Sequence, residues 1–133
     1  MSALKSNNIQ LWHSIIETRD AGKLDEILDA QVVFHSPIVH TPQNGRQVTK
    51  LYLAAAIQVF GNESFQYVRE VIGERDAVLE FTTEIEGIIV NGVDMIRWND
   101  EGRIVDFKVM LRPLKAINLI HRLMGEMLER LGK

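Results

Sequence analysis

The sequence has no cysteine, only three prolines, and no apolar run long enough to span a membrane. Without cysteine, the chain cannot form a disulfide framework, a thiolate zinc site or a cysteine nucleophile. Its 15 basic and 18 acidic residues give a net charge of −3 and form no cationic stripe, so we expect no nucleic-acid partner. The N-terminal residues also lack the apolar core of a signal peptide. We therefore expect a soluble cytoplasmic protein without a membrane partner.

The pattern of apolar residues predicts one domain, residues 1–133, because a chain of this length with 46% hydrophobic residues can bury its own core. Helical spacing appears at residues 4–20, 23–28 and 48–60, and again after Pro113. Extended runs appear at residues 32–36, 65–73, 77–86, 88–99 and 103–111, with a loop expected at 38–46 and a kink or turn considered at Asn91-Gly92. This order predicts an α+β fold, in which a curved, mostly antiparallel sheet wraps around helices to form a cone.

The segment GVDMIRWNDEGRIVDFKVMLRP, residues 92–113, combines a hairpin signature with an acidic residue. Two apolar runs flank the turn Asn99–Gly102, in which Gly102 is available for a positive φ. Because side chains alternate along a strand, Asp94 should share one face with Ile96 and Trp98. The carboxylate then either lines a pocket or is a structural group bonded to a tyrosine, a histidine or a backbone amide.

The same hairpin carries a resemblance to a known family. Residues 93–104, VDMIRWNDEGRI, resemble the hairpin of ketosteroid isomerases and SnoaL-like proteins, and the whole chain resembles the nuclear transport factor 2-like superfamily. Residues 20–23, DAGK, and 45–46, GR, add to the likeness. The resemblance implies a cystatin-like cone with an apolar cavity that contains Asp94. It also implies an isomerase, cyclase or hydratase acting on a small apolar carbonyl or polyketide-like compound, and pairing of two chains through the convex face of the sheet.

The resemblance to ketosteroid isomerases covers only part of their catalytic set. Asp94 matches the aspartate that these enzymes keep protonated in an apolar site, where it donates a hydrogen bond to the developing oxyanion. Their general base is an aspartate before a proline at the end of the first strand, and Ser36 stands at that position. A serine hydroxyl does not abstract a carbon-bound proton without a second base. Ile15 stands where their oxyanion tyrosine would be, so we do not expect ketosteroid isomerase activity.

Four residues are candidate catalytic groups: Asp94 as acid or base, helped by Ser36, His40 or Tyr52. Two readings of Tyr52 stay open, since its hydroxyl either enters the pocket or only caps the core. His35 and His40 suggest an acid/base pair or a metal site, but their spacing across Pro37 matches no known ligand pattern. His35 should face away from the cone if Phe34 and Ser36 face into it. We expect neither a metal nor a cofactor.

The expected partner is a small apolar molecule, although the residues expected to line its cavity are also of the types that build a core. They are Trp12, Ile15, Phe34, Phe81, Phe107, Val109 and Leu111. We also expect a homodimer, because Phe65, Tyr67, Val71, Val105 and the last helix offer more apolar surface than a monomer needs. A non-catalytic ligand-binding or dimeric interaction module is the alternative function. A second ionisable group near Asp94 would favour the enzyme.

Overall fold

The computed structural model describes the backbone of residues 2–132 and the side chains of residues 9–132. The predicted contribution of Leu4 to the first helix therefore lies outside the described side chains. The elements, in order, are α1 (Ser2–Thr18), the 3-10 turn η1 (Ala21–Lys23), α2 (Leu24–Ile27), β1 (Leu28–His35), β2 (Gln43–Asn44), α3 (Arg46–Phe60), β3 (Gln66–Ile72), β4 (Asp76–Ile85), β5 (Ile88–Trp98), β6 (Ile104–Arg112) and α4 (Leu114–Leu131). The predicted α+β class is confirmed. None of the described helices is long and apolar enough to cross a membrane.

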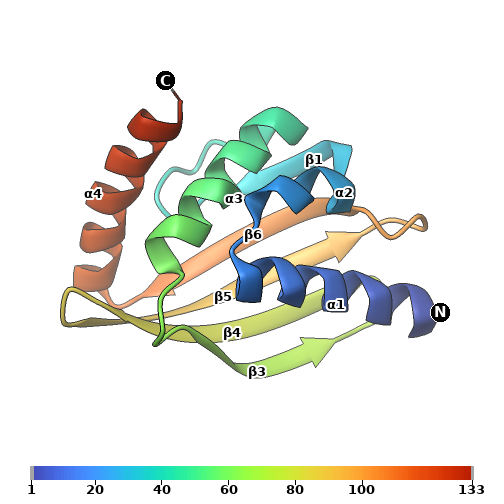
Figure 1. Ribbon diagram of the computed structural model, residues 1–133, viewed down its shortest axis with the longest axis horizontal. Coiled ribbons are helices and arrows are strands. Elements are labelled where there is room, and N and C mark those ends of the chain that lie inside the picture. Colours follow the sequence, from blue (N-terminus) through green and yellow to red (C-terminus); the bar gives the residue numbers. More distant parts are fainter. Residues whose placement is uncertain (1, 133) are drawn as a thin grey trace.

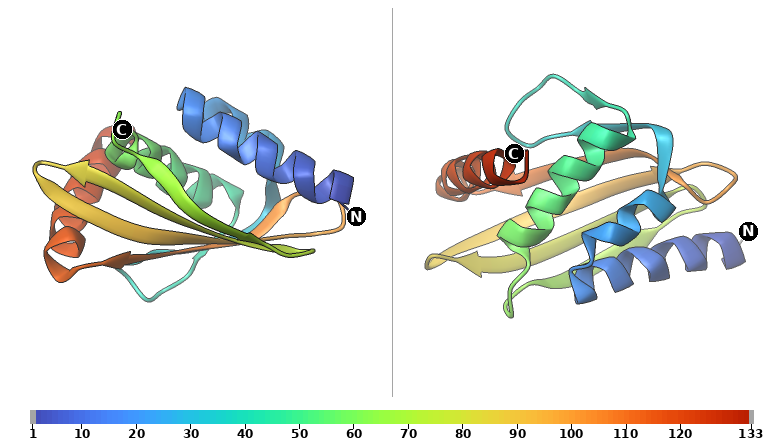
Figure 2. Two further views of the ribbon diagram at one scale, coloured as in Figure 1. Left: turned by 90° about the horizontal axis from the view of Figure 1, so that it is seen from below. Right: turned by 45° about the horizontal axis from the view of Figure 1, so that its top comes forward.

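The strands form one open six-stranded sheet in the order β2-β1-β6-β5-β4-β3. Strands β1 and β6 run parallel and every other neighbouring pair is antiparallel, which agrees with the predicted mostly antiparallel sheet. Helices α1, α3 and α4 all lie on one face, with α4 across one end of the strands (Figures 1 and 2). We call this face the inner face and the opposite one the outer face. The helices therefore close the inner face into a cone.

The prediction was wrong at the boundary between the second helix and the first strand. The α-helix covers only Leu24–Ile27 after the 3-10 turn, and Leu28 already begins β1, four residues before the predicted start of the strand. The reason is pairing, since Leu28 lies opposite Ile104 of β6, and such tertiary contacts override local propensity. The loop predicted at residues 38–46 also contains β2, because Asn44 pairs with Val33 at the edge of β1.

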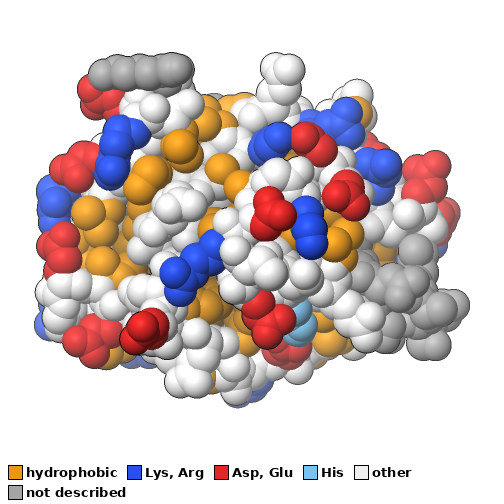
Figure 3. All heavy atoms as spheres, viewed as in Figure 1, with side chains coloured by type: hydrophobic (Ala, Val, Ile, Leu, Met, Phe, Trp, Pro, Cys, Tyr) orange, Lys and Arg blue, Asp and Glu red, His pale blue; other side chains and the backbone are white. Residues whose placement is uncertain are grey.

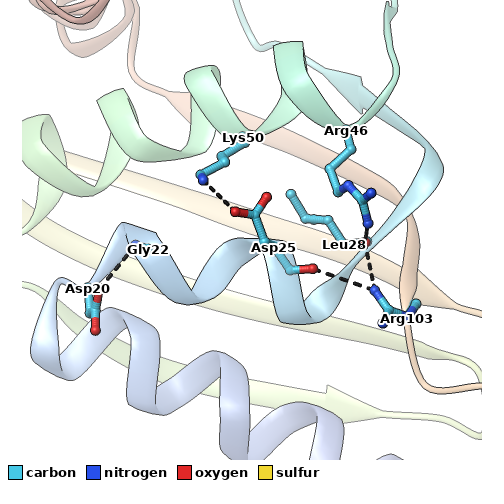
Figure 4. A network of polar contacts seen from close by, with 7 residues as sticks. All are labelled: Asp20, Gly22, Asp25, Leu28, Arg46, Lys50 and Arg103. Carbon is cyan, nitrogen blue, oxygen red and sulfur yellow. Dashed lines mark hydrogen bonds and ion pairs between the residues drawn. The ribbon is translucent and has the colours of Figure 1, made fainter.

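A polar network fixes α2 and the start of β1 against α3 and the turn between β5 and β6 (Figure 4). Arg46 of α3 and Arg103 beside the turn each donate from Nη1 to the carbonyl oxygen of Leu28, over 3.3 Å. Lys50 Nζ of α3 donates to Asp25 Oδ2 of α2 over 2.6 Å. Two of these bonds meet at the Leu28 carbonyl and the third lies beside it, so together they link α3 to α2, to β1 and to the turn between β5 and β6.

Strand β5 shows the predicted alternation. Asp94, Ile96 and Trp98 are buried on the inner face, while Met95 and Arg97 are exposed on the outer face. The turn that follows has Gly102 at φ 81°, as predicted. Strand β5 continues through Gly92 without the turn that the sequence suggested. A side chain at Gly92 would meet the Phe81 ring at 2.6 Å, so the glycine lets that ring pack closely over the strand.

Candidate functional site

A cavity of about 570 Å³ lies between the inner face of the sheet and helices α1 and α3. Its size falls within the range of small-molecule sites, roughly 300–1,000 Å³. We call it the Asp94 cavity. Its apolar lining is Trp12, Ile16, Leu53, Ala56, Ile57, Phe60, Phe65, Phe81, Phe107 and Val109, and its polar or charged lining is His13, Glu17, Arg19, Asn62, Gln66, Tyr67, Glu70 and Asp94, with Gly61 completing the wall.

Asp94 lies in the wall of this cavity and is only 7% exposed. Tyr67 donates its hydroxyl proton to Asp94 Oδ2 over 2.7 Å, and Trp12 Nε1 donates to the Tyr67 hydroxyl over 2.9 Å. The three side chains come from β5, β3 and α1, so this chain of bonds links the sheet to the first helix. The two readings of Asp94 are thus not exclusive, since the carboxylate is in the cavity wall and also bonded to a tyrosine.

The apolar surroundings change the protonation of this pair. Burial raises the pKa of Asp94 to about 7, and the hydrogen bond from Tyr67 only partly opposes this rise. Burial, together with the negative charge of Asp94, raises the pKa of Tyr67 well above its usual value. Tyr67 therefore remains a protonated donor, whereas Asp94 exchanges its proton near neutral pH. A carboxyl group with this property suits general acid/base chemistry.

A second pair of ionisable side chains lines the same cavity. His13 Nε2 of α1 lies 2.6 Å from Glu70 Oε2 of β3, and the His13 ring centroid lies 5.7 Å from that of Tyr67. The sequence interpretation missed Tyr67, His13 and Glu70. In a regular strand, Tyr67 and Glu70 would point to opposite faces, but a bulge between Tyr67 and Arg69 turns both inward. No feature of the sequence marks that bulge.

Comparison with known proteins agrees with this architecture. Residues 9–107 match the model of the SnoaL-like domain. The chain belongs to the SnoaL-like domain family. Among curated proteins, none matches this SnoaL-like domain significantly.

Three solved structures show how the SnoaL-like domain relates to others. It is 36% identical to a steroid delta-isomerase from Pseudomonas aeruginosa, with a TM-score of 0.91 over 97% of this chain and 94% of that one. A bacterial protein with a cystatin-like fold from Silicibacter pomeroyi is 28% identical, with a TM-score of 0.83 over 90% and 83% of the two chains. A nuclear transport factor 2-like protein of unknown function from Mesorhizobium loti is 18% identical, with a TM-score of 0.73 over 84% of this chain and 93% of that one. At this low identity the similarity shows only a shared fold.

Four of the seven residues expected to line the ligand site are found in the wall of the Asp94 cavity: Trp12, Phe81, Phe107 and Val109. The other three lie elsewhere in the SnoaL-like domain. Ile15 is fully buried in the core, because the turn of α1 directs Ile16 to the cavity instead. Phe34 packs on Tyr52 with ring centroids 5.3 Å apart. Leu111 is half-buried and packs against two clusters of buried core residues, one that includes Trp12 and Phe107 and one that includes Phe60 and Phe81.

Ser36 and Tyr52 line a second cavity of about 210 Å³, which we call the α4 cavity. This cavity lies where α4 packs on α3. The surface over these two helices shows apolar side chains between charged ones (Figure 3). The two cavities share Ala56, Phe60 and Val109 as lining. Ser36 Oγ accepts hydrogen bonds from the amides of Ile38 and Val39, so this hydroxyl stabilises the turn after β1.

The two histidines near Pro37 lie away from Asp94. His40 is exposed in the loop after β1 and lines neither cavity. His35 faces the outer side of the sheet, as predicted from its alternation with Phe34, and its Nε2 lies 2.9 Å from Asp106 Oδ1 of β6. The structure therefore brings Asp94 together with Tyr67, Trp12, His13 and Glu70, and it brings Ser36, His40 and Tyr52 to none of them.

Proposed function

We propose that this SnoaL-like domain binds a small apolar carbonyl compound in the Asp94 cavity and that Asp94 exchanges a proton with the bound compound. Proton transfer of this kind belongs to isomerases, cyclases and hydratases. One observation carries the proposal: a buried carboxylate stands in the wall of a ligand-sized, mostly apolar cavity. Among the described residues, only Tyr67 donates a side-chain hydrogen bond to it, at Oδ2. The other oxygen, Oδ1, is then available to a ligand.

The surroundings of Asp94 support a role as general acid. Its pKa of about 7 means that both protonation states are populated at neutral pH, which is the condition for efficient proton transfer. Trp12 and Tyr67 fix the carboxyl group, so its orientation needs no rearrangement when a ligand binds. As negative charge develops on a carbonyl oxygen, protonated Asp94 donates its hydrogen bond and stabilises that charge. The apolar wall excludes water, which strengthens this interaction.

Exchange of carbon-bound protons tests the proposal without knowledge of the natural substrate. The probe is 2-tetralone, an apolar ketone whose protons beside the carbonyl are replaced by deuterium in D₂O when an enzyme enolises it, as nuclear magnetic resonance detects. We expect exchange above the buffer rate, and a loss of roughly 10²- to 10⁴-fold in Asp94→Asn. The control is Asp106→Asn, which removes a carboxylate from the outer face and should leave exchange unchanged. Exchange that does not depend on Asp94 would contradict the proposal.

Ligand binding without catalysis is the second candidate, favoured by the existing bond from Tyr67 to Asp94. Trp12 lines the cavity, so tryptophan fluorescence reports binding of 2-tetralone independently of any reaction. Binding that weakens in Asp94→Asn, without any proton exchange, would favour this candidate. Exchange together with binding would favour the enzyme.

A further inference from the structure

An enolising enzyme needs a base at carbon as well as an acid at oxygen, and the Asp94 cavity contains one further pair suited to that role. His13 and Glu70 both line the cavity, with Nε2 and Oε2 2.6 Å apart. Their side chains are 32% and 27% exposed, so they lie at the rim, whereas Asp94 is buried. The His13 ring packs against the Tyr67 ring, whose hydroxyl bonds Asp94. The two titratable centres are therefore separated by a single tyrosine.

The contact with Glu70 determines which nitrogen of His13 can act as a base. An ionised carboxylate only accepts hydrogen bonds, so Nε2 of a neutral His13 must carry the proton. The lone pair is then on Nδ1, and the carboxylate stabilises the imidazolium that forms when Nδ1 takes up a proton. A histidine oriented by a carboxylate is the arrangement that general bases commonly use.

We propose that His13 is the general base of this cavity, with Glu70 as its positioning residue, and that the substrate is an apolar ketone with a hydrogen on the carbon beside its carbonyl. This inference rests on the proposed function of Asp94. In the step, the C–H bond breaks, its proton forms an N–H bond at His13 Nδ1, and its electron pair moves into the enolate. The enolate oxygen accepts the hydrogen bond or the proton of Asp94. When His13 returns its proton to carbon and any proton taken up by the oxygen passes back to Asp94, both residues are restored, so no co-reactant is needed.

A second histidine–carboxylate pair in the chain serves as a control that separates a role of His13 as base from a merely structural role. His35 and Asp106 form the same kind of contact over 2.9 Å, with similar exposures of 29% and 40%, but on the outer face and away from both cavities. A structural tether between α1 and β3 would survive His13→Gln, because a glutamine amide also donates to Glu70. General-base catalysis would be lost in His13→Gln, because glutamine has no basic nitrogen.

The first test is the exchange of 2-tetralone protons in D₂O. We expect His13→Gln to lower the rate at least about tenfold and the control His35→Gln to leave it unchanged. Glu70→Gln should lower the rate at saturating 2-tetralone without changing the half-saturating concentration, which a loss of binding would raise. Exchange lost in Asp94→Asn but retained in His13→Gln would overturn the base and leave the proposed function intact. No exchange by the unmutated protein would overturn both.

A second test uses 2-bromoacetophenone, an apolar ketone that alkylates histidine. The imidazole nitrogen attacks the CH₂ carbon, a C–N bond forms and bromide leaves, and peptide mass spectrometry identifies the labelled residue. We expect 2-tetralone to protect His13 from labelling but not His35, His40 or His121. Asp94→Asn should still be labelled at His13, because alkylation needs no acid. Labelling of His13 that 2-tetralone does not slow would place this ring outside the ligand site and overturn the inference.

Discussion

Asp94 is a destabilising residue when it is ionised, because its carboxylate is buried in apolar surroundings. Its pKa rises from 3.8 to about 7 on folding. Between these values the folded state binds more protons than the unfolded state, so stability falls as the pH rises from about 4 to about 7. Below this pH window the carboxyl group is neutral in both the folded and the unfolded state. Above it, the full free-energy cost of burying the ionised carboxylate lowers the stability. That cost is on the order of a few kcal/mol, since one pKa unit corresponds to about 1.4 kcal/mol.

We therefore expect Asp94→Asn to stabilise the protein at high pH. Asparagine cannot ionise, has nearly the same shape, and its amide oxygen can still accept the hydrogen bond from Tyr67. The gain in the free energy of unfolding should be about 1–4 kcal/mol near pH 8 and smaller near pH 5. Urea denaturation at both pH values measures it. Asp106→Asn serves as the outer-face control. Equal stability of Asp94→Asn and the unmutated protein near pH 8 would show that the carboxylate is not desolvated as the structure indicates.

At the scale of single elements, the strands with a regular period could be predicted from sequence and the irregular ones could not. The hairpin of β5 and β6 has strict alternation and a turn with a glycine at positive φ, so the inward direction of Asp94 followed from the pattern. Strand β3 contains a bulge, which places Tyr67 and Glu70 on the same face against their spacing. The sequence interpretation therefore found Asp94 in the cavity wall but missed Tyr67 and Glu70 of β3. Phe65 and Tyr67, expected on the dimer surface, instead line the cavity.

The end of β1 shows why Ser36, which was expected to help Asp94, does not reach the Asp94 cavity. Ser36 follows β1 directly, at the place of the isomerase base, but it lines the α4 cavity and bonds two backbone amides. A motif preserves the position of a residue along the chain. It does not preserve the cavity wall that surrounds the residue, which depends here on how α4 packs on α3. Tyr52 was placed in the α4 cavity by the same packing.

We expect no isomerisation of a Δ5-3-ketosteroid by this protein. Ser36 lacks the basicity to remove a carbon-bound proton, and Ile15 cannot donate to an oxyanion. The proposed base, His13, comes from α1, and its positioning residue Glu70 comes from β3, which lies three strands away from β6, the neighbour of β1. A steroid aligned for a base at the end of β1 would therefore present the wrong carbon to His13. Ultraviolet absorbance of the conjugated enone measures the reaction. Turnover that Ser36→Ala abolishes would contradict this expectation.

At the scale of the whole molecule, the helices cover one face of the sheet and leave the outer face bare (Figure 2). A row of registered neighbours crosses this face from β3 to β5: Val71, Val78 and Met95. Val71 is 62% exposed, and Met110 of β6 is 51% exposed. Charged pairs lie on both sides of this row, Arg97 with Asp76 on one side and Arg69 with Glu80 on the other. An apolar centre with a polar rim is typical of a protein–protein interface.

Our last prediction is a homodimer that pairs through this outer face. A symmetric pair buries the same patch twice, so a single charge introduced at its centre acts on both subunits. Analytical ultracentrifugation at micromolar concentration should give twice the mass of one 15.2 kDa chain. Met110→Glu should lower it to the mass of a monomer, because two buried carboxylates would lack partners. Leu114→Glu, on the exposed start of α4, is the matched control and should leave the dimer intact. A dimer that only Leu114→Glu disrupts would assign the interface to α4, and a single-chain mass for the unmutated protein would refute the dimer.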